Sequence, residues 1–168
     1  MMSVPLWLII AVPASTLLLI GIAVLFGPPY VPTLRLHLNT ALDMLDLKEG
    51  QTMLDLGSGD GRVLVAAAKR GWNAVGIEVS PVLVLVSKIR CWRYRKQIRI
   101  IWGNYFLTSW PLQTDAIFSF MIQYQMKRLD ERITEWHTRP IKLATFAFQI
   151  PGKTAVAERD AVYLYEYK

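Results

Sequence analysis

Residues 53–62 read MLDLGSGDGR, and this stretch decides the fold of the chain. It combines a short apolar strand with a turn whose glycines, at 57, 59 and 61, allow the backbone to come close to a ligand. The turn leads into a predicted helix, whose first N–H groups favour an anionic or polar ligand. The next predicted strand ends in Glu78, whose carboxylate can accept hydrogen bonds from both hydroxyls of a ribose. The spacing therefore predicts a site for a cofactor that contains a nucleoside.

The positions of the glycines distinguish two kinds of nucleoside site. A dinucleotide-binding fingerprint requires its third glycine three residues after the second, and that position holds Arg62. The pattern here is GxGxG preceded by Asp55, which resembles motif I of the class I S-adenosylmethionine (AdoMet) methyltransferases. The resemblance implies that Asp55 and the glycine loop hold the methionine end of AdoMet, and that Glu78 holds the ribose. A glycine-rich turn in an ordinary α/β domain is the alternative.

Strand and helix signals alternate along the rest of the chain. Strands are expected near residues 52–56, 72–78, 98–102, 115–121 and 141–148, followed by an antiparallel pair at 154–158 and 161–167. Helices are expected near 33–45, 60–70, 81–95 and 125–137. This order predicts a Rossmann-like, doubly wound α/β sheet of the seven-strand methyltransferase type, with an antiparallel last strand. The short connection at Pro151-Gly152 leaves no room for the usual helix between strands five and six.

Residues 6–26 form a long apolar segment without a charged side chain. As a helix, they would match the thickness of a bilayer's hydrocarbon core, which predicts a transmembrane anchor at residues 1–27 and a catalytic domain at 28–168. A cleaved signal peptide or an amphipathic segment is the alternative, although no Lys or Arg precedes the run. Arg35, the first basic residue, follows the run and favours a single-pass protein with its catalytic domain on the cytoplasmic or matrix side.

The formal net charge of the chain is +6, and its basic residues concentrate in one segment. They are Lys88, Arg90, Arg93, Arg95, Lys96 and Arg99, interleaved with aromatic residues. Three explanations stay open: a nucleic-acid footprint, a solvated helix end whose cations complement the helix dipole, and attraction to anionic lipid headgroups. The single cysteine, Cys91, fits a reducing compartment, and the isolated His37 and His137 predict no metal site.

Several segments resemble one small group of methyltransferases more closely than they resemble the superfamily. They are PPYVPT at 28–33, the loop DLGSGDGRV, VGIE at 75–78 followed by Ser80-Pro81, FQIPG at 148–152 and YLYE at 163–166. Together they are similar to the short membrane-anchored lysine methyltransferases, which include the mitochondrial enzymes acting on ATP synthase and on the adenine nucleotide translocase. The resemblance implies an AdoMet-dependent N-methyltransferase for lysine side chains of membrane or membrane-proximal proteins.

The same resemblance implies a set of site residues. Those expected to bind the cofactor are Asp55, Gly57, Ser58, Gly59, Glu78, Asn104 and Tyr105. Asn104 and Tyr105 would lie beside the adenine, although related enzymes commonly have Asp in place of Asn104. Tyr30 and Thr33 would cover the cofactor or the substrate channel, or would only join the anchor to the domain. The channel itself is expected after the fourth strand, at residues 119–124 with Ser119 and Met121, where no residue is an obvious general base.

Other functions are also compatible with the sequence. Gly27-Pro28-Pro29-Tyr30 looks like the Asn/Asp-Pro-Pro-aromatic motif of enzymes that methylate nucleic-acid bases, but it precedes the first strand, and the position after the fourth strand holds SFMIQY. Methylation of bases by that mechanism is therefore disfavoured. A methyltransferase for a lipid, quinone or other small amphiphile stays open. A non-catalytic membrane scaffold that retains the fold is the third possibility, against which the intact Asp55 and Glu78 argue.

Overall fold

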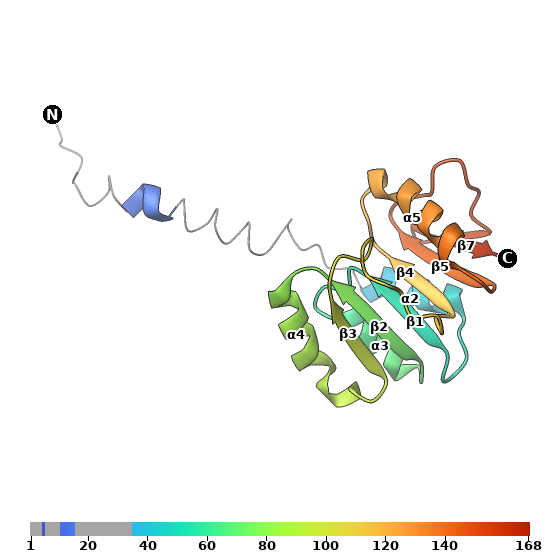
Figure 1. Cartoon of the computed structure of the whole chain (residues 1–168), viewed down its shortest axis with the longest axis horizontal. Helices are drawn as coiled ribbons and strands as arrows, with labels where there is room; N and C mark the ends of the chain where they lie inside the picture. The colour runs from blue at the N-terminus through green and yellow to red at the C-terminus, as the bar shows by residue number, and fades with distance from the viewer. Residues whose placement is uncertain (1–4, 6–10, 16–34) are drawn as a thin grey trace. The chain divides into compact units, whose positions relative to one another are not determined.

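The structure is a computed structural model that describes residue 5, residues 11–15 and residues 35–168. The chain divides into two compact units, Met1–Val31 and Pro32–Lys168. The second unit contains all the strands and the helices that follow residue 34 (Figure 1).

This second unit is built on a seven-stranded sheet with the order β3-β2-β1-β4-β5-β7-β6. The strands are β1 (Thr52–Leu56), β2 (Asn73–Glu78), β3 (Ile98–Trp102), β4 (Ala116–Ser119), β5 (Ile141–Phe146), β6 (Ala157–Arg159) and β7 (Val162–Tyr167). The first five strands are parallel, and β7 runs antiparallel to both β5 and β6. The expected Rossmann-like methyltransferase sheet is therefore confirmed.

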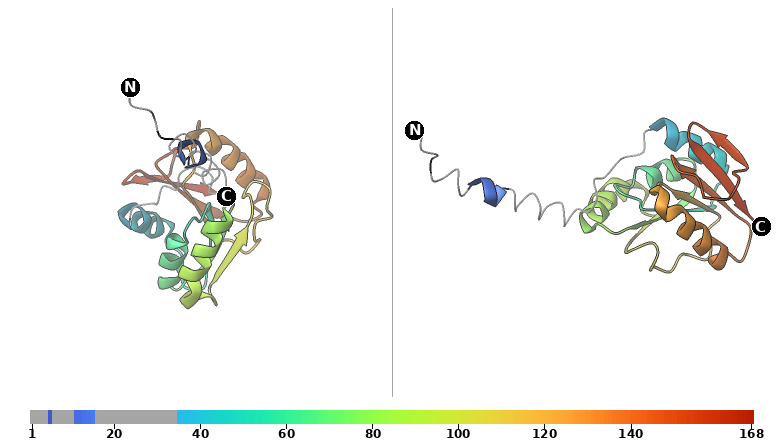
Figure 2. Two further views of the ribbon diagram at one scale, coloured as in Figure 1. Left: turned by 90° about the vertical axis from the view of Figure 1, so that its left-hand side faces the viewer. Right: turned by 90° about the horizontal axis from the view of Figure 1, so that it is seen from above.

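Helices cover the two faces of the sheet unequally (Figure 1 and Figure 2). The helices are α2 (Arg35–Leu45), α3 (Arg62–Lys69), α4 (Pro81–Cys91) and α5 (Gln123–Trp136), and a 3-10 turn, η1 (Trp92–Tyr94), follows α4. One core cluster joins the sheet to α2, α3 and the end of α4, and another joins its opposite face to α5. The segment 103–115, between β3 and β4, forms a loop whose Phe106 and Trp110 pack into the α5-side core.

Some predicted boundaries differ from the observed ones. The helix expected from residue 60 begins at Arg62, because Gly61 adopts a left-handed conformation (φ 79°) just before it. The helix expected to continue to residue 95 ends at Cys91 and tightens into η1. Residues 147–156 contain no helix, as expected from the short connection at Pro151-Gly152.

The predicted localisation as a single-pass membrane protein with an internal catalytic domain is contradicted. In the part of the chain that the structure describes, no helix is long and apolar enough to cross a membrane. Most of the segment behind that prediction, residues 1–27, lies outside the described residues, which include there only Pro5 and the helical residues 11–15. Tyr30 and Thr33 also lie outside them.

Candidate functional site

The candidate site begins at the turn between β1 and α3. Gly57, Gly59 and Gly61 all have positive φ angles, of 85°, 53° and 79°, in the region that glycine adopts most readily. The N–H groups of Gly57 and Ser58 donate to the carbonyl oxygen of Ile77 at 2.9 and 3.1 Å. The turn is therefore fixed to β2 at its start and leads directly into the first turn of α3.

Two buried carboxyl groups lie near the carboxyl ends of β1 and β2, on the same face of the sheet. Leu54, Leu56 and Ile77 pack into the core on the α5 side. Because successive side chains of a strand point to opposite faces, Asp55 and Glu78 point to the side of α3. Both are buried. The two predicted acids therefore share one side of the sheet with the glycine turn.

Asp55 is the buried acid whose charge is least compensated. Burial, together with the negative charges of Glu78 and Asp60, raises the pKa of its carboxyl group to about 8. Its Oδ2 atom has no hydrogen-bond partner among the described residues. A cationic ligand group beside Asp55 would stabilise the carboxylate and lower this pKa. The methionine end of AdoMet carries such a group, an ammonium, so the orphaned oxygen fits that cofactor.

Glu78 joins the glycine turn to the start of α4. Its Oε2 accepts a hydrogen bond from the Gly59 N–H at 2.9 Å, and its Oε1 accepts one from the Ser80 N–H at 2.8 Å. Each carboxylate oxygen has two lone pairs, so both can accept a further hydrogen bond. The carboxylate is thus oriented by the backbone and still able to bind the two hydroxyls of a ribose.

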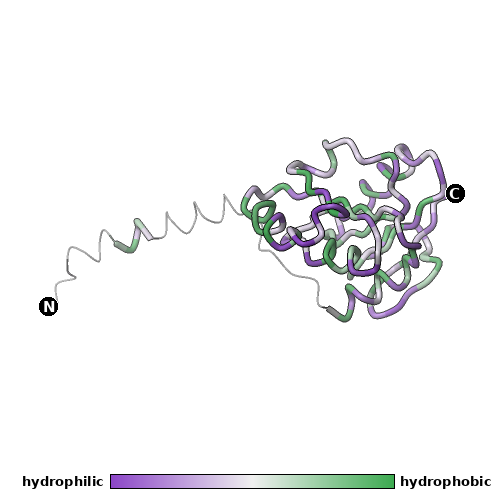
Figure 3. Tube along the Cα trace, turned by 90° about the horizontal axis from the view of Figure 1, so that it is seen from below, coloured by the Kyte–Doolittle hydropathy of each residue, from purple (hydrophilic) through white to green (hydrophobic). Residues whose placement is uncertain are grey.

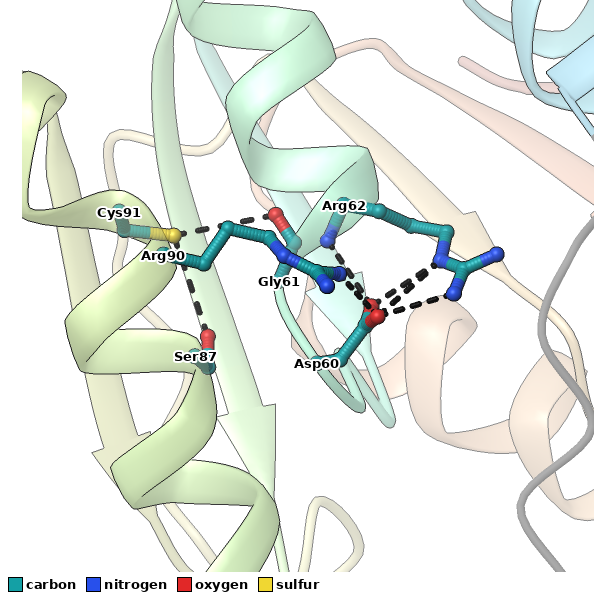
Figure 4. A network of polar contacts seen from close by, with 6 residues as sticks. All are labelled: Asp60, Gly61, Arg62, Ser87, Arg90 and Cys91. Atoms are coloured by element: carbon teal, nitrogen blue, oxygen red, sulfur yellow. Dashed lines mark hydrogen bonds and ion pairs between the residues drawn. The ribbon is translucent and has the colours of Figure 1, made fainter.

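Asp60, in the glycine turn, connects this turn to α3 and α4 through ion pairs with arginines of both helices. The sequence did not indicate this role. The Asp60 carboxylate accepts hydrogen bonds from the Arg62 side chain, with Nη2 at 2.9 Å, and forms an ion pair with Arg90 of α4 (Figure 4). The Cys91 thiol donates to the carbonyl oxygen of Gly61 at 3.7 Å beside this network. Arg90 was assigned only to the basic cluster, because sequence spacing gives no sign that it pairs with Asp60.

Ser58 packs toward β2 rather than standing free in the turn. A Cβ atom added to Gly76 would lie 2.5 Å from the Ser58 Oγ and 2.7 Å from a Leu64 methyl group. The Ser58 side chain is buried, and its Oγ has no hydrogen-bond partner in the described part of the chain. Gly76 therefore provides the space for this side chain, a role that the sequence motif did not reveal.

The loop after β3 carries Asn104 and Tyr105. The exposed Asn104 accepts a hydrogen bond from the Phe106 N–H through its Oδ1 at 2.8 Å. A Cβ atom on Gly57 would be 4.0 Å from the Tyr105 ring, and the Tyr105 hydroxyl donates to Gln125 of α5 at 3.0 Å. Tyr105 therefore lies next to the glycine turn and connects the loop to α5.

The residues expected to line a substrate channel separate into buried and exposed positions. Ser119, at the end of β4, is fully buried, and Met121 belongs to the core on the α5 side. The exposed side chains of the same segment are those of Ile122, Gln123 and Tyr124. A substrate that approaches this segment therefore meets these exposed residues first.

A comparison with known protein families shows to which family the chain belongs. The ANTKMT methyltransferase domain matches residues 55–157. The chain belongs to this methyltransferase family. A lysine N-methyltransferase of Caenorhabditis elegans, whose name specifies ATP synthase, is 40% identical over 155 residues, which cover 82% of this chain and 80% of that protein. The resemblance drawn from the sequence is confirmed.

Other relatives match over a shorter part of the family domain. The protein of the same name from Xenopus laevis is 48% identical over 65 residues, which cover 39% of this chain and only 28% of that protein. Among solved structures, an RNA methyltransferase from Salinibacter ruber in complex with S-adenosyl-L-homocysteine superposes with a TM-score of 0.74. The match covers 82% of this chain and 92% of that one at 21% identity, so this likeness concerns the fold alone.

Proposed function

We propose that this protein is an AdoMet-dependent N-methyltransferase that acts on lysine side chains of proteins. The observation that carries the proposal is the pair of buried acids beside the glycine turn, one of them, Asp55, with an orphaned oxygen. Membership of the methyltransferase family supports the reaction class. The names of the relatives, which specify lysine and ATP synthase, support a membrane protein as the substrate.

In this proposal the domain at 28–168 binds AdoMet at the carboxyl ends of β1, β2 and β3. Asp55 binds the ammonium of the methionine end, the turn 57–59 approaches the same end with its backbone, and Glu78 binds the ribose hydroxyls. Asn104 and Tyr105 lie beside the adenine. The tentative lid and channel residues are Tyr30, Thr33, Ser119 and Met121.

AdoMet supplies a methyl group bound to a positively charged sulfur, and the protein positions the amine that accepts it. Most of the catalysis then comes from alignment of the amine with the methyl carbon and from exclusion of water. With a reference pKa near 10.4, only about one lysine in a thousand is neutral at pH 7, and desolvation at the segment 119–124 increases this share. Burial raises the pKa of Tyr105, so its hydroxyl keeps the proton that it donates to Gln125. We assign no general base.

The proposal is tested with methyl-labelled AdoMet. The full-length protein in detergent is incubated with the labelled cofactor and membranes from cells that lack its gene, and proteins are then separated from lipids. Label in a protein band that maps to a lysine is the expected result. The Asp55→Ala, Glu78→Ala double variant should give none, whereas Asp46→Asn, a change on an exposed loop, should retain the activity.

Other outcomes identify the alternative functions. Label in the lipid fraction would show that the substrate is a lipid, quinone or other amphiphile and not a protein. A protein that fails to bind AdoMet in a calorimetric titration would be a scaffold that retains the fold without its chemistry.

A further inference from the structure

Helix α4 presents an apolar face to the outside of the domain. Leu85 and Ile89 are 60% and 69% exposed, and Val82 and Val86 are exposed beside them. Such positions, at spacings of three and four residues, form one continuous stripe along a helix. Figure 3 shows how strongly hydrophobic this helix is. A stripe of this kind ordinarily faces a core.

The opposite side of α4 is the one that packs against the domain. Its buried residues are Val84, Ser87 and Cys91, and the helix contacts α3, β2 and β3. The outer stripe is therefore additional to the packing face. It continues past the end of the helix through Trp92, which is 67% exposed. Trp102, at the end of the edge strand β3, is 68% exposed and lies near the start of α4, where its indole donates to the Val79 carbonyl.

The charge around this stripe has one sign. No Asp or Glu occurs between Glu78 and Asp115, whereas all the basic residues of the cluster at 88–99 fall within this stretch. Arg90 is paired with Asp60, and the Arg95 guanidinium lies 4.9 Å from the Trp92 ring. Within the cluster, the exposed cations that form no salt bridge with another described residue are Lys88, Arg93, Arg95, Lys96 and Arg99.

We propose that α4 and η1 bind the surface of an anionic lipid bilayer. Val82, Leu85, Val86 and Ile89 would enter the boundary between headgroups and acyl chains, with the helix parallel to the surface. An apolar stripe, a cationic border and a tryptophan at the edge are the features of helices that lie in a membrane interface. The unpaired cations complement the negative surface potential of such a bilayer.

The same features disfavour other occupants of this face. A second copy of the chain docked through α4 would bring two sets of unpaired cations together without an acid between them. Nucleic acid would match the cations but would leave Leu85 and Ile89 facing phosphates. Only a partner that is apolar in its centre and anionic at its surface satisfies both the stripe and its border.

This mode of binding would place the cofactor site close to the lipid. Ser80 caps α4, and its N–H donates to the carboxylate of Glu78, so the start of the helix is bonded to the proposed ribose-binding acid. The inference does not depend on the methyltransferase reaction. It explains how this domain would meet lysines close to a membrane surface.

A fluorescent label on α4 tests its contact with lipid directly, because it reports only on the surroundings of the labelled position. An environment-sensitive fluorophore is attached to Ile89→Cys in the full-length protein, and to Val156→Cys as the matched control. Val156 is 58% exposed and precedes β6, at the opposite edge of the sheet. The native Cys91 is buried, and labelled wild-type protein measures its background.

Vesicles of phosphatidylcholine with about 30% phosphatidylglycerol should shift the emission at position 89 to the blue and should leave position 156 unchanged. Salt at about 0.5 M, or the substitutions Lys88→Glu and Lys96→Glu, should weaken the vesicle affinity measured at position 89 at least about tenfold. Lys127→Glu on α5, which is exposed as well, is the matched charge control and should weaken it much less.

Three results would overturn the proposal. One is the absence of a shift at position 89 in a variant that still binds AdoMet as wild type does. Another is a shift without vesicles that grows with protein concentration, which would indicate a second copy. The third is a shift produced by single-stranded RNA but not by vesicles. None of these measurements involves methyl transfer, so the lipid contact and the proposed reaction can fail separately.

Discussion

At the scale of single residues, the charge state of Asp55 distinguishes the empty site from the loaded one. Its carboxyl pKa is about 8, raised from 3.8 chiefly by burial and then by Glu78 and Asp60. In the unfolded chain the group ionises near its ordinary pKa. Between these two values the native state holds a proton that the unfolded state releases. This difference makes both stability and ligand binding depend on pH.

The first prediction concerns stability in the absence of ligand. As the pH rises from about 4 to about 8, Asp55 should lower the free energy of unfolding by at most about 1.4 kcal/mol per pH unit. Asp55→Asn removes this contribution, so the variant should gain stability relative to wild type between pH 5 and pH 8. Urea denaturation at both pH values measures the gain. An equal stability difference at the two values would show that Asp55 titrates normally.

Binding of AdoMet should release a proton from the same residue. The ammonium of the cofactor favours the carboxylate, so at pH 7 up to one proton should leave Asp55 when the complex forms. Calorimetric titrations in buffers of different ionisation enthalpy count the protons released. Asp55→Asn should bind AdoMet more weakly and without this release. Proton release that persists in the variant would have to come from another group.

Gly76 is the residue that controls the packing of the turn. In Gly76→Ala the new methyl group would lie 2.5 Å from the Ser58 Oγ and 2.7 Å from Leu64, so the turn or the helix must shift. We expect a loss of about 1–3 kcal/mol in the free energy of unfolding, together with weaker AdoMet binding. Gly103→Ala is the control, because its Cβ would meet only the end of the Thr108 side chain. Urea denaturation and calorimetry compare the two variants.

At the scale of elements, the contact between α3 and α4 shapes the site. Gly61 fits beside Ser87 and Cys91 of α4, where a Cβ would lie 2.4 Å from the Ser87 Oγ. Asp60 receives one arginine from each helix. The turn is therefore held on the α4 side as well as by β2. A change in α4 should affect the cofactor site without touching the cofactor.

Arg90→Ala tests this coupling. The Arg90 side chain is partly exposed, and Asp60 keeps Arg62 as a partner, so the expected cost is only about 1 kcal/mol of stability. AdoMet affinity should nevertheless fall several-fold, because the turn loses its ion pair with α4 and keeps only the contacts of Gly61 with Ser87 and Cys91. Arg93→Ala, which removes a cation without a salt bridge, should change neither quantity. Equal losses in the two variants would show that general charge, rather than the pair with Asp60, is responsible.

At the scale of the whole molecule, local patterns predicted the sheet and the turn but not the contacts between distant segments. The strands, the glycine turn and Glu78 followed from alternation, glycine spacing and one acid at a strand end. The pairing of Asp60 with Arg90 joins positions that no sequence period relates. The outer face of α4 was also hidden, because VLVLV is apolar on every side and cannot indicate which side packs.

The contacts of the loop 103–115 with the core also could not be predicted from local sequence patterns. The loop covers one face of the sheet beside α5, and Trp110 is its central contact. The Trp110 indole donates to the Tyr105 carbonyl at 2.8 Å, packs edge-on against Trp136 and lies under the Arg132 guanidinium. Because Trp110 is buried and fills this part of the core, Trp110→Ala should lower the free energy of unfolding by about 3–5 kcal/mol.

A second tryptophan variant, at an exposed position, distinguishes the stability cost of lost core packing from the cost of losing any indole ring. Trp102→Ala removes an exposed ring and should cost less than about 1 kcal/mol, although it also loses the indole bond to the Val79 carbonyl. Urea denaturation of both variants gives the two costs. A small cost for Trp110→Ala would mean that α5 and the strands hold the fold alone. The expected large cost would show that the loop, through Trp110, belongs to the folded core that holds Tyr105 next to the glycine turn.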